Sequence, residues 1–503
     1  MKIKSLFRNS FFSLLSQLVL LLFGFLSQRA MNLYMGTELV GMNGVISNVI
    51  SMLSVTELGV STAIVYHLYS ALVSRDERQI AALMNLYRKA YYVFAAVLTV
   101  LGLALIPVVH LFMTNKSYSV GYVRVLYLLW LLRSVLSYLL SYKKSLLIAD
   151  QNEYIVSVTT ILANVIGYSA IILFVSTTGR YLPALITGVL GDTILNLWVS
   201  WYTDKKYPFL RRYRKEKAGN ETIQKIMNDI KNIFVSRLSQ NLLNGTDNLI
   251  ISGFINVATV GIFSNYGLIT RSVGNIIRAL AMSIQPGVGN LFVEEDHEKN
   301  YRVLRQMTFL FFLIVAVAAC GLYVMIDSFV EDIWLGKTFG WDSASVFLSV
   351  TGCIFLGIGQ PIAVVMAVSG LFHREKTLSV LSSVVNLIVS IALVIPFGTA
   401  GVLLCTCLAY LIQIRYRIYF FFHEYVKMDE KRYVFDLLEY GVLIAVEVIV
   451  TKQVVHLVYC QSLFTFLLGV GICVFIPMTI NVSIFCRSGR LKSVRQLFSS
   501  VRR

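Results

Sequence analysis

The sequence predicts an all-α polytopic membrane protein with about fourteen transmembrane helices. Of its 503 residues, 57% are hydrophobic and 14% are charged, and the mean hydropathy is +0.71. A soluble chain carries about 25% charged residues, so this composition excludes a water-soluble enzyme, a disordered chain, a coiled coil and a collagen-like repeat. The apolar runs are too long and too continuous for the alternating pattern of a membrane β-barrel.

Fourteen stretches have the roughly 20 apolar residues that a helix needs to cross a bilayer. The first has a basic start and an apolar middle but no small-residue cleavage site, so we expect an uncleaved first helix. The stretches lie near residues 9–30, 39–66, 90–112, 119–142, 155–177, 182–202, 233–255, 258–284, 303–326, 343–368, 378–397, 400–422, 438–457 and 462–485.

The distribution of Lys and Arg predicts the orientation. With the N-terminus inside, 32 of the 44 basic residues fall in cytoplasmic segments and seven fall within spans. This bias is a strong positive-inside signal and places both termini in the cytoplasm. The opposite side holds five basic residues: Arg29, Lys116, Arg180, Lys337 and Lys452.

A basic loop divides the chain into related halves. We expect an N-lobe at 1–203, a basic cytoplasmic linker at 204–232, a C-lobe at 233–423, and spans 13 and 14 with a basic tail at 424–503. A shift of 220 residues places Val40-Gly41 on Val260-Gly261 and spans 1–6 on spans 7–12, as in transporters built from internal repeats.

Polar residues recur at helical spacing in corresponding spans of both halves. Such a stripe forms one face of each helix. Interhelical hydrogen bonding is one interpretation, and a shared hydrophilic cavity is the other, which the repetition favours. The stripes are Ser13, Gln17, Gly24 and Ser27 or Gln28 in span 1, Asn43, Ser47, Ser51 and Ser54 in span 2, Ser236, Gln240, Asn244 and Asp247 in span 7, and Ser264, Arg271, Asn275 and Arg278 in span 8.

The segments SQRAMNLYMG and LVGMNGVISNVISMLSVTELGVSTAI, and GTDNLIISGFINVATVGIFSNYGL in span 7, resemble the polysaccharide-transporter family. These are the Wzx-type O-antigen flippases of the multidrug/oligosaccharidyl-lipid/polysaccharide exporter superfamily. The resemblance covers essentially the whole chain in span number and loop order. It implies two six-helix lobes around a central cavity lined by helices 1, 2, 7 and 8, with two additional C-terminal helices.

The resemblance also implies the function. The chain would turn an oligosaccharide on undecaprenyl pyrophosphate from the inner to the outer leaflet of the bacterial inner membrane, by alternating access. The cargo would be a repeat unit of O-antigen, capsule or exopolysaccharide, and other polysaccharide assembly proteins could be partners. We expect a monomer in the lipid bilayer, no nucleic-acid partner and no cofactor, and the coupling ion, a proton or sodium, is open.

Ionisable residues at membrane depth are costly, which makes them candidates for function. Arg271 and Arg278 share a face with Asn275, and an arginine fork suits a pyrophosphate. Arg29 either serves the cavity or extends to the interface, and Arg133 is a further substrate-binding candidate.

Acidic and amide residues form a second group, of coupling or cavity residues. Asp247 could bind a coupling cation or pair with Arg271, and Glu57 could instead mark the exit of span 2. Asp192 and Glu447 are weaker candidates, and Pro361 could break span 10. The uncharged members of the group are Asn244, Gln240, Asn43 and Ser47.

Two other function classes are weighed against a flippase. Export of small amphiphiles or drugs is the alternative, although a cationic cavity disfavours cationic drugs. A membrane glycosyltransferase or polymerase needs catalytic groups in sizeable outer loops, and the first outer loop has only Glu38 as an acid. The seven Cys and six His show no disulfide framework or metal-ligand spacing, so we expect no enzyme and no metal site.

Overall fold

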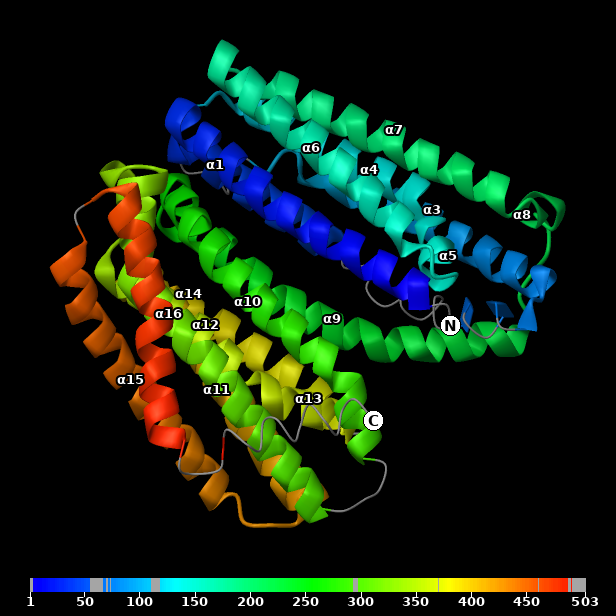
Figure 1. Ribbon diagram of the computed structural model, residues 1–503. Coiled ribbons are helices and arrows are strands. Elements are labelled where there is room, and N and C mark those ends of the chain that lie inside the picture. Colours follow the sequence, from blue (N-terminus) through cyan, green and yellow to red (C-terminus); the bar gives the residue numbers. More distant parts are fainter. Residues whose placement is uncertain are drawn as a thin grey trace. The chain divides into compact units, whose positions relative to one another are not determined.

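The computed structural model describes residues 3–54, 67–68, 71–72, 74–109, 118–292, 297–369, 371–459, 461–486 and 490. The side chains of some helical residues, among them 231–244, lie outside that description. Within the described part every regular element is a helix (Figure 1), which confirms the predicted all-α fold. Glu57 lies outside the described residues.

The chain divides into two compact units, residues 1–261 and 262–503. The first unit holds α1 (Ile3–Leu53), α3 (Glu77–Leu105), α4 (Val120–Ser141), α5 (Lys144–Ala149), α6 (Glu153–Thr178), α7 (Leu182–Lys206), α8 (Phe209–Arg212), α9 (Asn220–Phe254) and the start of α10 (Val257–Phe292). The second holds the rest of α10, then α11 (His297–Ser328), η3 (Phe329–Trp334), η4 (Lys337–Phe339), α12 (Ser343–Ile358), α13 (Gln360–Val368), α14 (Phe372–Phe420), η5 (Phe421–Val426), α15 (Lys431–Val458) and α16 (Leu463–Phe485).

Two of the long helices are each a pair of spans joined at a glycine. In α1 the backbone leaves the helical region at Gly36, whose φ is 78°, between the first two predicted stretches. In α14 it does so at Gly398, whose φ is 57°, two residues after Pro396. Glycine adopts a positive φ without the steric cost of a Cβ, so the helix can change direction within one residue.

Span 10 is broken into two helices just before a proline, where the sequence predicts a break. Helix α12 ends at Ile358, and α13 begins at Gln360 with Pro361 in its first turn. A proline in the first turn needs no partner for its missing N–H, whereas inside a helix it removes a hydrogen bond. The predicted break at Pro361 is therefore confirmed.

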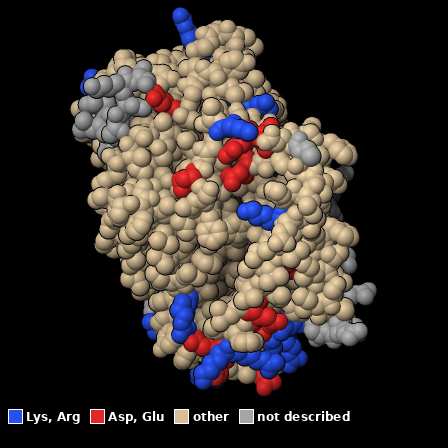
Figure 2. Space-filling model, turned by 90° about the vertical axis from the view of Figure 1, so that its left-hand side faces the viewer, with Lys and Arg blue, Asp and Glu red and all other residues tan. Residues whose placement is uncertain are grey.

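Among the described residues, nine helices are long and apolar enough to cross a membrane, and two of these are the broken pairs in α1 and α14. Each of the fourteen predicted stretches overlaps a helix of the structure. Figure 2 shows one face on which most of the surface belongs to neither acidic nor basic residues, and where charged side chains gather in separate groups. A large uncharged surface is what lipid requires of a multi-pass protein.

In the first unit, α1 packs against α6 and α9, and α7 packs against α4 and α6 (Figure 1). The α6–α7 contact is made by two glycines. A Cβ added to Gly188 would lie 3.8 Å from the Cα of Gly167. Small residues let helix backbones approach closely, which is how helices associate in lipid.

The tightest approach in the first unit joins α1 to the start of α10. A Cβ on Gly41 would lie 1.9 Å from the carbonyl oxygen of Val257, and a Cβ on Gly261 would lie 2.1 Å from that of Thr37. Adding 220 to 37 and to 41 gives 257 and 261, so the two halves of the contact are equivalent under the repeat. We call these four residues the glycine crossing.

In the second unit, α11 is the central helix. It packs against α12, α13, α15 and α16, and Val315, Ala316, Ala319 and Cys320 are fully buried in it. The two additional helices α15 and α16 are thus attached to the unit mainly through α11 and through each other.

Candidate functional site

The predicted anion-binding residues lie along one side of α10. The side chains of Arg271 and Asn275 are exposed and that of Arg278 is half-buried. One flank of the stripe is packed, with Thr270, Ile277 and Ala281 all buried, whereas Ile276 and Leu280, on the far side of the helix, are exposed as well. Residues at i, i+4 and i+7 share a helix face, so the polar stripe predicted from the sequence forms one of the accessible surfaces of α10.

Glycines one turn earlier make room for both arginines. A Cβ on Gly267 would lie 3.0 Å from Nη1 of Arg271, and one on Gly274 would lie 3.7 Å from Nη2 of Arg278. The Nε of Arg278 is buried without a hydrogen-bond partner. A guanidinium has five N–H donors and no acceptor, so this buried donor calls for an anionic or carbonyl oxygen.

Arg133 is placed differently, because it is held by an acid. Its Nε lies 2.6 Å from Oδ2 of Asp192, which joins α4 to α7. The same guanidinium lies 5.3 Å from the ring centroid of Trp130, and Nε1 of Trp130 donates a 3.0 Å hydrogen bond to Oδ1 of Asn43. A polar chain thus runs from the predicted stripe of α1 to a pair of opposite charges in α4 and α7.

The other predicted residues of the first unit differ in burial. Arg29 and Ser47 are exposed on α1. Asp247 of α9 is 8% exposed. Two residues before it, the carbonyl of Gly245 accepts a 3.0 Å hydrogen bond from the side chain of Asn48 in α1. The side chains of Gln240 and Asn244 fall outside the described residues.

Two polar groups were missed from the sequence. The first is a run of buried residues in α14, where the amide of Asn386 and the hydroxyl of Ser390 have no hydrogen-bond partner. Its spacing of three or four residues could have been found, but without charges it does not stand out from ordinary helix-forming sequence. The run is Ser379, Ser382, Ser383, Asn386 and Ser390.

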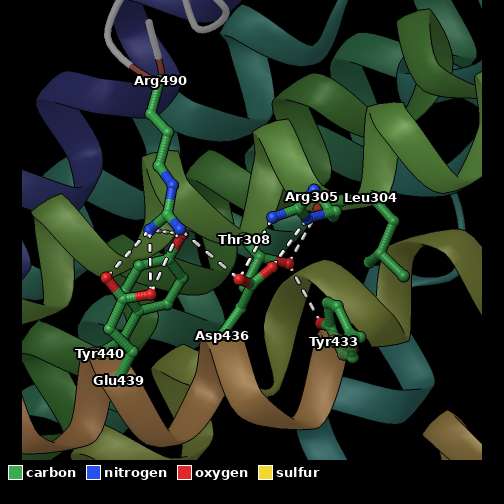
Figure 3. Close-up of polar contacts among 8 residues, drawn as sticks. All are labelled: Leu304, Arg305, Thr308, Tyr433, Asp436, Glu439, Tyr440 and Arg490. Atoms are coloured by element: carbon green, nitrogen blue, oxygen red, sulfur yellow. Dashed lines mark hydrogen bonds and ion pairs between the residues drawn. The ribbon is translucent and has the colours of Figure 1, made fainter. Parts of the chain in front are cut away.

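The second missed group is an ion network at the start of α15 (Figure 3). Arg305 of α11 donates to both oxygens of Asp436, at 2.7 and 3.2 Å. Arg490 lies 3.6 Å from Asp436 and 3.2 Å from Glu439. The residues of this network lie up to 185 positions apart in the sequence, so no local sequence pattern relates them.

Comparison with solved structures identifies the fold. The lipid II flippase MurJ in an inward closed conformation matches with a TM-score of 0.65 and 15% identity, over 95% of this chain and 98% of that one. An inward-facing multidrug resistance MATE family transporter of the MOP superfamily matches with a TM-score of 0.61 and 14% identity, over 79% and 93%. A mutant of the Vibrio cholerae MATE transporter VcmN matches with a TM-score of 0.55 and 14% identity, over 84% and 98%.

The chain has the fold of the MOP superfamily transporters. No protein-family model and no curated protein matches the sequence. These matches confirm the predicted all-α transporter fold. The MurJ match extends over more of the chain than the two MATE matches do.

Proposed function

We propose that the chain is a flippase of the bacterial inner membrane. It turns an oligosaccharide linked to undecaprenyl pyrophosphate from the inner to the outer leaflet, with both of its termini in the cytoplasm. The proposal includes fourteen spans, a Wzx-type role in polysaccharide synthesis, and lobes at 1–203 and 233–423 that alternate in their access to a polar cavity.

One observation carries the choice of cargo. Arg271, Asn275 and Arg278 share one face of α10, on which Arg271 and Asn275 are exposed, and Arg278 has a buried donor without an acceptor. A pyrophosphate supplies several anionic oxygens, and bidentate arginine–phosphate pairs are among the strongest hydrogen bonds in proteins. Arg29 and Ser47, which are exposed on α1, are further candidate contacts for the cargo. Arg133 keeps a supporting role because Asp192 neutralises it.

The test is a flipping assay with the purified protein in proteoliposomes. The probe is undecaprenyl pyrophosphate carrying a short fluorescent oligosaccharide, and transfer is read from its protection against a membrane-impermeant quencher. We expect rapid protection with the wild-type chain, none with Arg278→Ala, and wild-type protection with Arg124→Ala. Arg124 is the matched control because it is exposed on α4 and belongs to none of the predicted polar stripes. Transfer no faster than in protein-free liposomes would refute the proposal.

Drug export is the second candidate, and the MATE matches favour it. It predicts efflux of a fluorescent cationic dye from the same proteoliposomes. The cationic face of α10 opposes that outcome, because burying like charges together costs Coulomb energy. Dye efflux without lipid transfer would show that the chain is a drug exporter and not a flippase.

A further inference from the structure

A buried carboxyl lies in the middle of α15, on a different helix from the residues of the proposed cargo site on α10. Glu447 is 0% exposed, and neither of its carboxyl oxygens has a hydrogen-bond partner. It is 11 residues past Asp436, about 16 Å along the helix at 1.5 Å per residue. An ion pair like that of Asp436 is therefore out of its reach.

The surroundings of Glu447 offer acceptors and thiols. Asn481 of α16 is the polar side chain against the carboxyl. Its Nδ2 is already used, donating at 2.8 Å to the carbonyl of Pro477, while its Oδ1 is buried without a partner. Three buried oxygens, the two of Glu447 and Oδ1 of Asn481, thus lack a hydrogen-bond partner. The adjacent amide donor, Nδ2 of Asn481, is shared with the carbonyl of Pro477. A proton on Glu447 would turn one of these acceptors into the missing donor.

The titratable groups that face Glu447 from the packed helices are thiols. Cys320 of α11 interacts with it and accepts a 3.6 Å hydrogen bond from Thr451, one turn further along α15. Cys473 of α16 lies in the same buried cluster as Cys320. The nearest charged group of α15 itself is Lys452, which is exposed five residues further along the helix. Toward the other end lie Glu439 and Asp436, which Arg305 and Arg490 compensate (Figure 3).

The ligand that suits this site is a proton. Hard metal cations take six or more oxygen ligands, and the site offers three. No group of three His, Cys, Asp or Glu residues arranged to hold a metal ion exists in the described part of the chain. An ionised carboxylate without a partner is very costly in an apolar interior, whereas a neutral carboxyl is not.

We propose that Glu447 is a proton-binding site that couples the α11–α15–α16 bundle to transport. With the bundle closed, the carboxyl holds a proton and donates it in a hydrogen bond to Oδ1 of Asn481. When α15 and α16 separate from α11, water reaches Glu447, the proton passes to the water, and the carboxylate stays solvated. The bundle closes again only after the carboxyl has taken up a proton. The coupling part of the proposal rests on the proposed function.

The first test needs no cargo. Dicyclohexylcarbodiimide reacts with protonated carboxyls in apolar surroundings, and peptide mass spectrometry locates the adduct. We expect labelling of Glu447 at mildly acidic pH and its loss at alkaline pH. Glu439 is the matched control, an acid on the same helix that is ion-paired and should stay unlabelled. The proton also stabilises the closed bundle, so its stabilisation is present at low pH and disappears as pH rises. Glu447→Gln, which cannot ionise, should remove that pH dependence of the melting temperature.

The second test adds a pH gradient to the proteoliposome assay. The gradient should accelerate lipid transfer by the wild-type chain and by Glu439→Gln, and Glu447→Gln should abolish the acceleration without lowering the melting temperature. Gradient-driven transfer that survives in Glu447→Gln would refute the coupling role. Absence of labelling at Glu447 in the wild-type chain would refute the proton site itself. Failure of the proposed function would instead appear as absent lipid transfer with the labelling and melting results intact.

Discussion

At the scale of single residues, the arginines within the membrane differ in what neutralises them. Arg133 lies 2.6 Å from Asp192, Arg417 is paired with Glu375 and Arg415 lies 2.8 Å from Glu430. Arg278 has a buried N–H without an acceptor. The positions of these arginines in the sequence do not show this difference. Their acidic ion-pair partners in the structure indicate which arginine is available to bind an anion.

The first prediction concerns Arg271. Arg271→Ala should abolish lipid transfer at a normal protein level, and Arg271→Lys should retain part of it, since charge remains while the planar fork is lost. The proteoliposome assay measures both, with protein quantified in the membrane.

The alternative for Arg271 is neutralisation of Asp247. In that case the double variant Arg271→Ala with Asp247→Ala should restore transfer. Restoration would contradict a phosphate-binding role, and continued loss would support it.

The second prediction concerns the Arg133–Asp192 pair. Arg133→Met should destabilise the protein by about 1–3 kcal/mol, because Asp192 would be left without its partner at membrane depth. The double variant Arg133→Met with Asp192→Leu should recover most of that loss, since replacing both charges removes the unpaired one. Thermal unfolding in detergent gives both values, and an equal loss in the two variants would show that the pair is not the cause.

At the scale of helices, the glycine crossing fixes how closely α1 meets the start of α10. Neither Gly41 nor Gly261 has room for a methyl group, because backbone carbonyls of the other helix occupy it. A carbonyl in a helix is a rigid neighbour, unlike the flexible end of a side chain. The crossing is therefore a contact between backbones, and side-chain rotation cannot relieve a substitution there.

The third prediction follows from that rigidity. Gly41→Ala and Gly261→Ala should each destabilise the protein by about 1–3 kcal/mol, the usual cost of overpacking. Gly24→Ala is the matched control on the same helix, because nothing lies within 4 Å of its added methyl group. The double variant should cost less than the sum, since one substitution separates the helices and the other then meets open space. Additive losses in thermal unfolding would show that the two contacts are independent.

The sequence predicts the elements better than it predicts their partners. Helices and the breaks near Gly36, Pro361 and Gly398 follow from apolar length and from glycine and proline chemistry, which are local. The polar stripe of α10 also follows from local residue spacing, and its members Arg271 and Asn275 are exposed in the structure. The Arg305–Asp436 and Arg133–Asp192 pairs join residues 131 and 59 positions apart, so only the packed fold brings them together.

At the scale of the whole molecule, the uneven distribution of Lys and Arg predicts the topology. The fourth prediction is that reporter fusions after Arg180 and after Lys217 give opposite sides of the membrane. Arg180 follows α6 directly, and Lys217 lies in the basic segment between α8 and α9, so a single span, α7, separates them. Alkaline phosphatase and green fluorescent protein fusions measure the two sides. The same side for both would contradict the assignment of α7 as a membrane span.

The symmetry of the glycine crossing bears on how the two halves of the chain arose in evolution. Thr37 meets Gly261 and Gly41 meets Val257, so each half of the repeat offers the other the same two positions. In a symmetric dimer this is an isologous contact, in which residue i touches j and j touches i. A single half-length chain carrying a small residue at one position would already have possessed both sides of the joint. Fusion of two such genes would have retained this interface. The two halves would then be joined covalently, so they would no longer need to associate by diffusion.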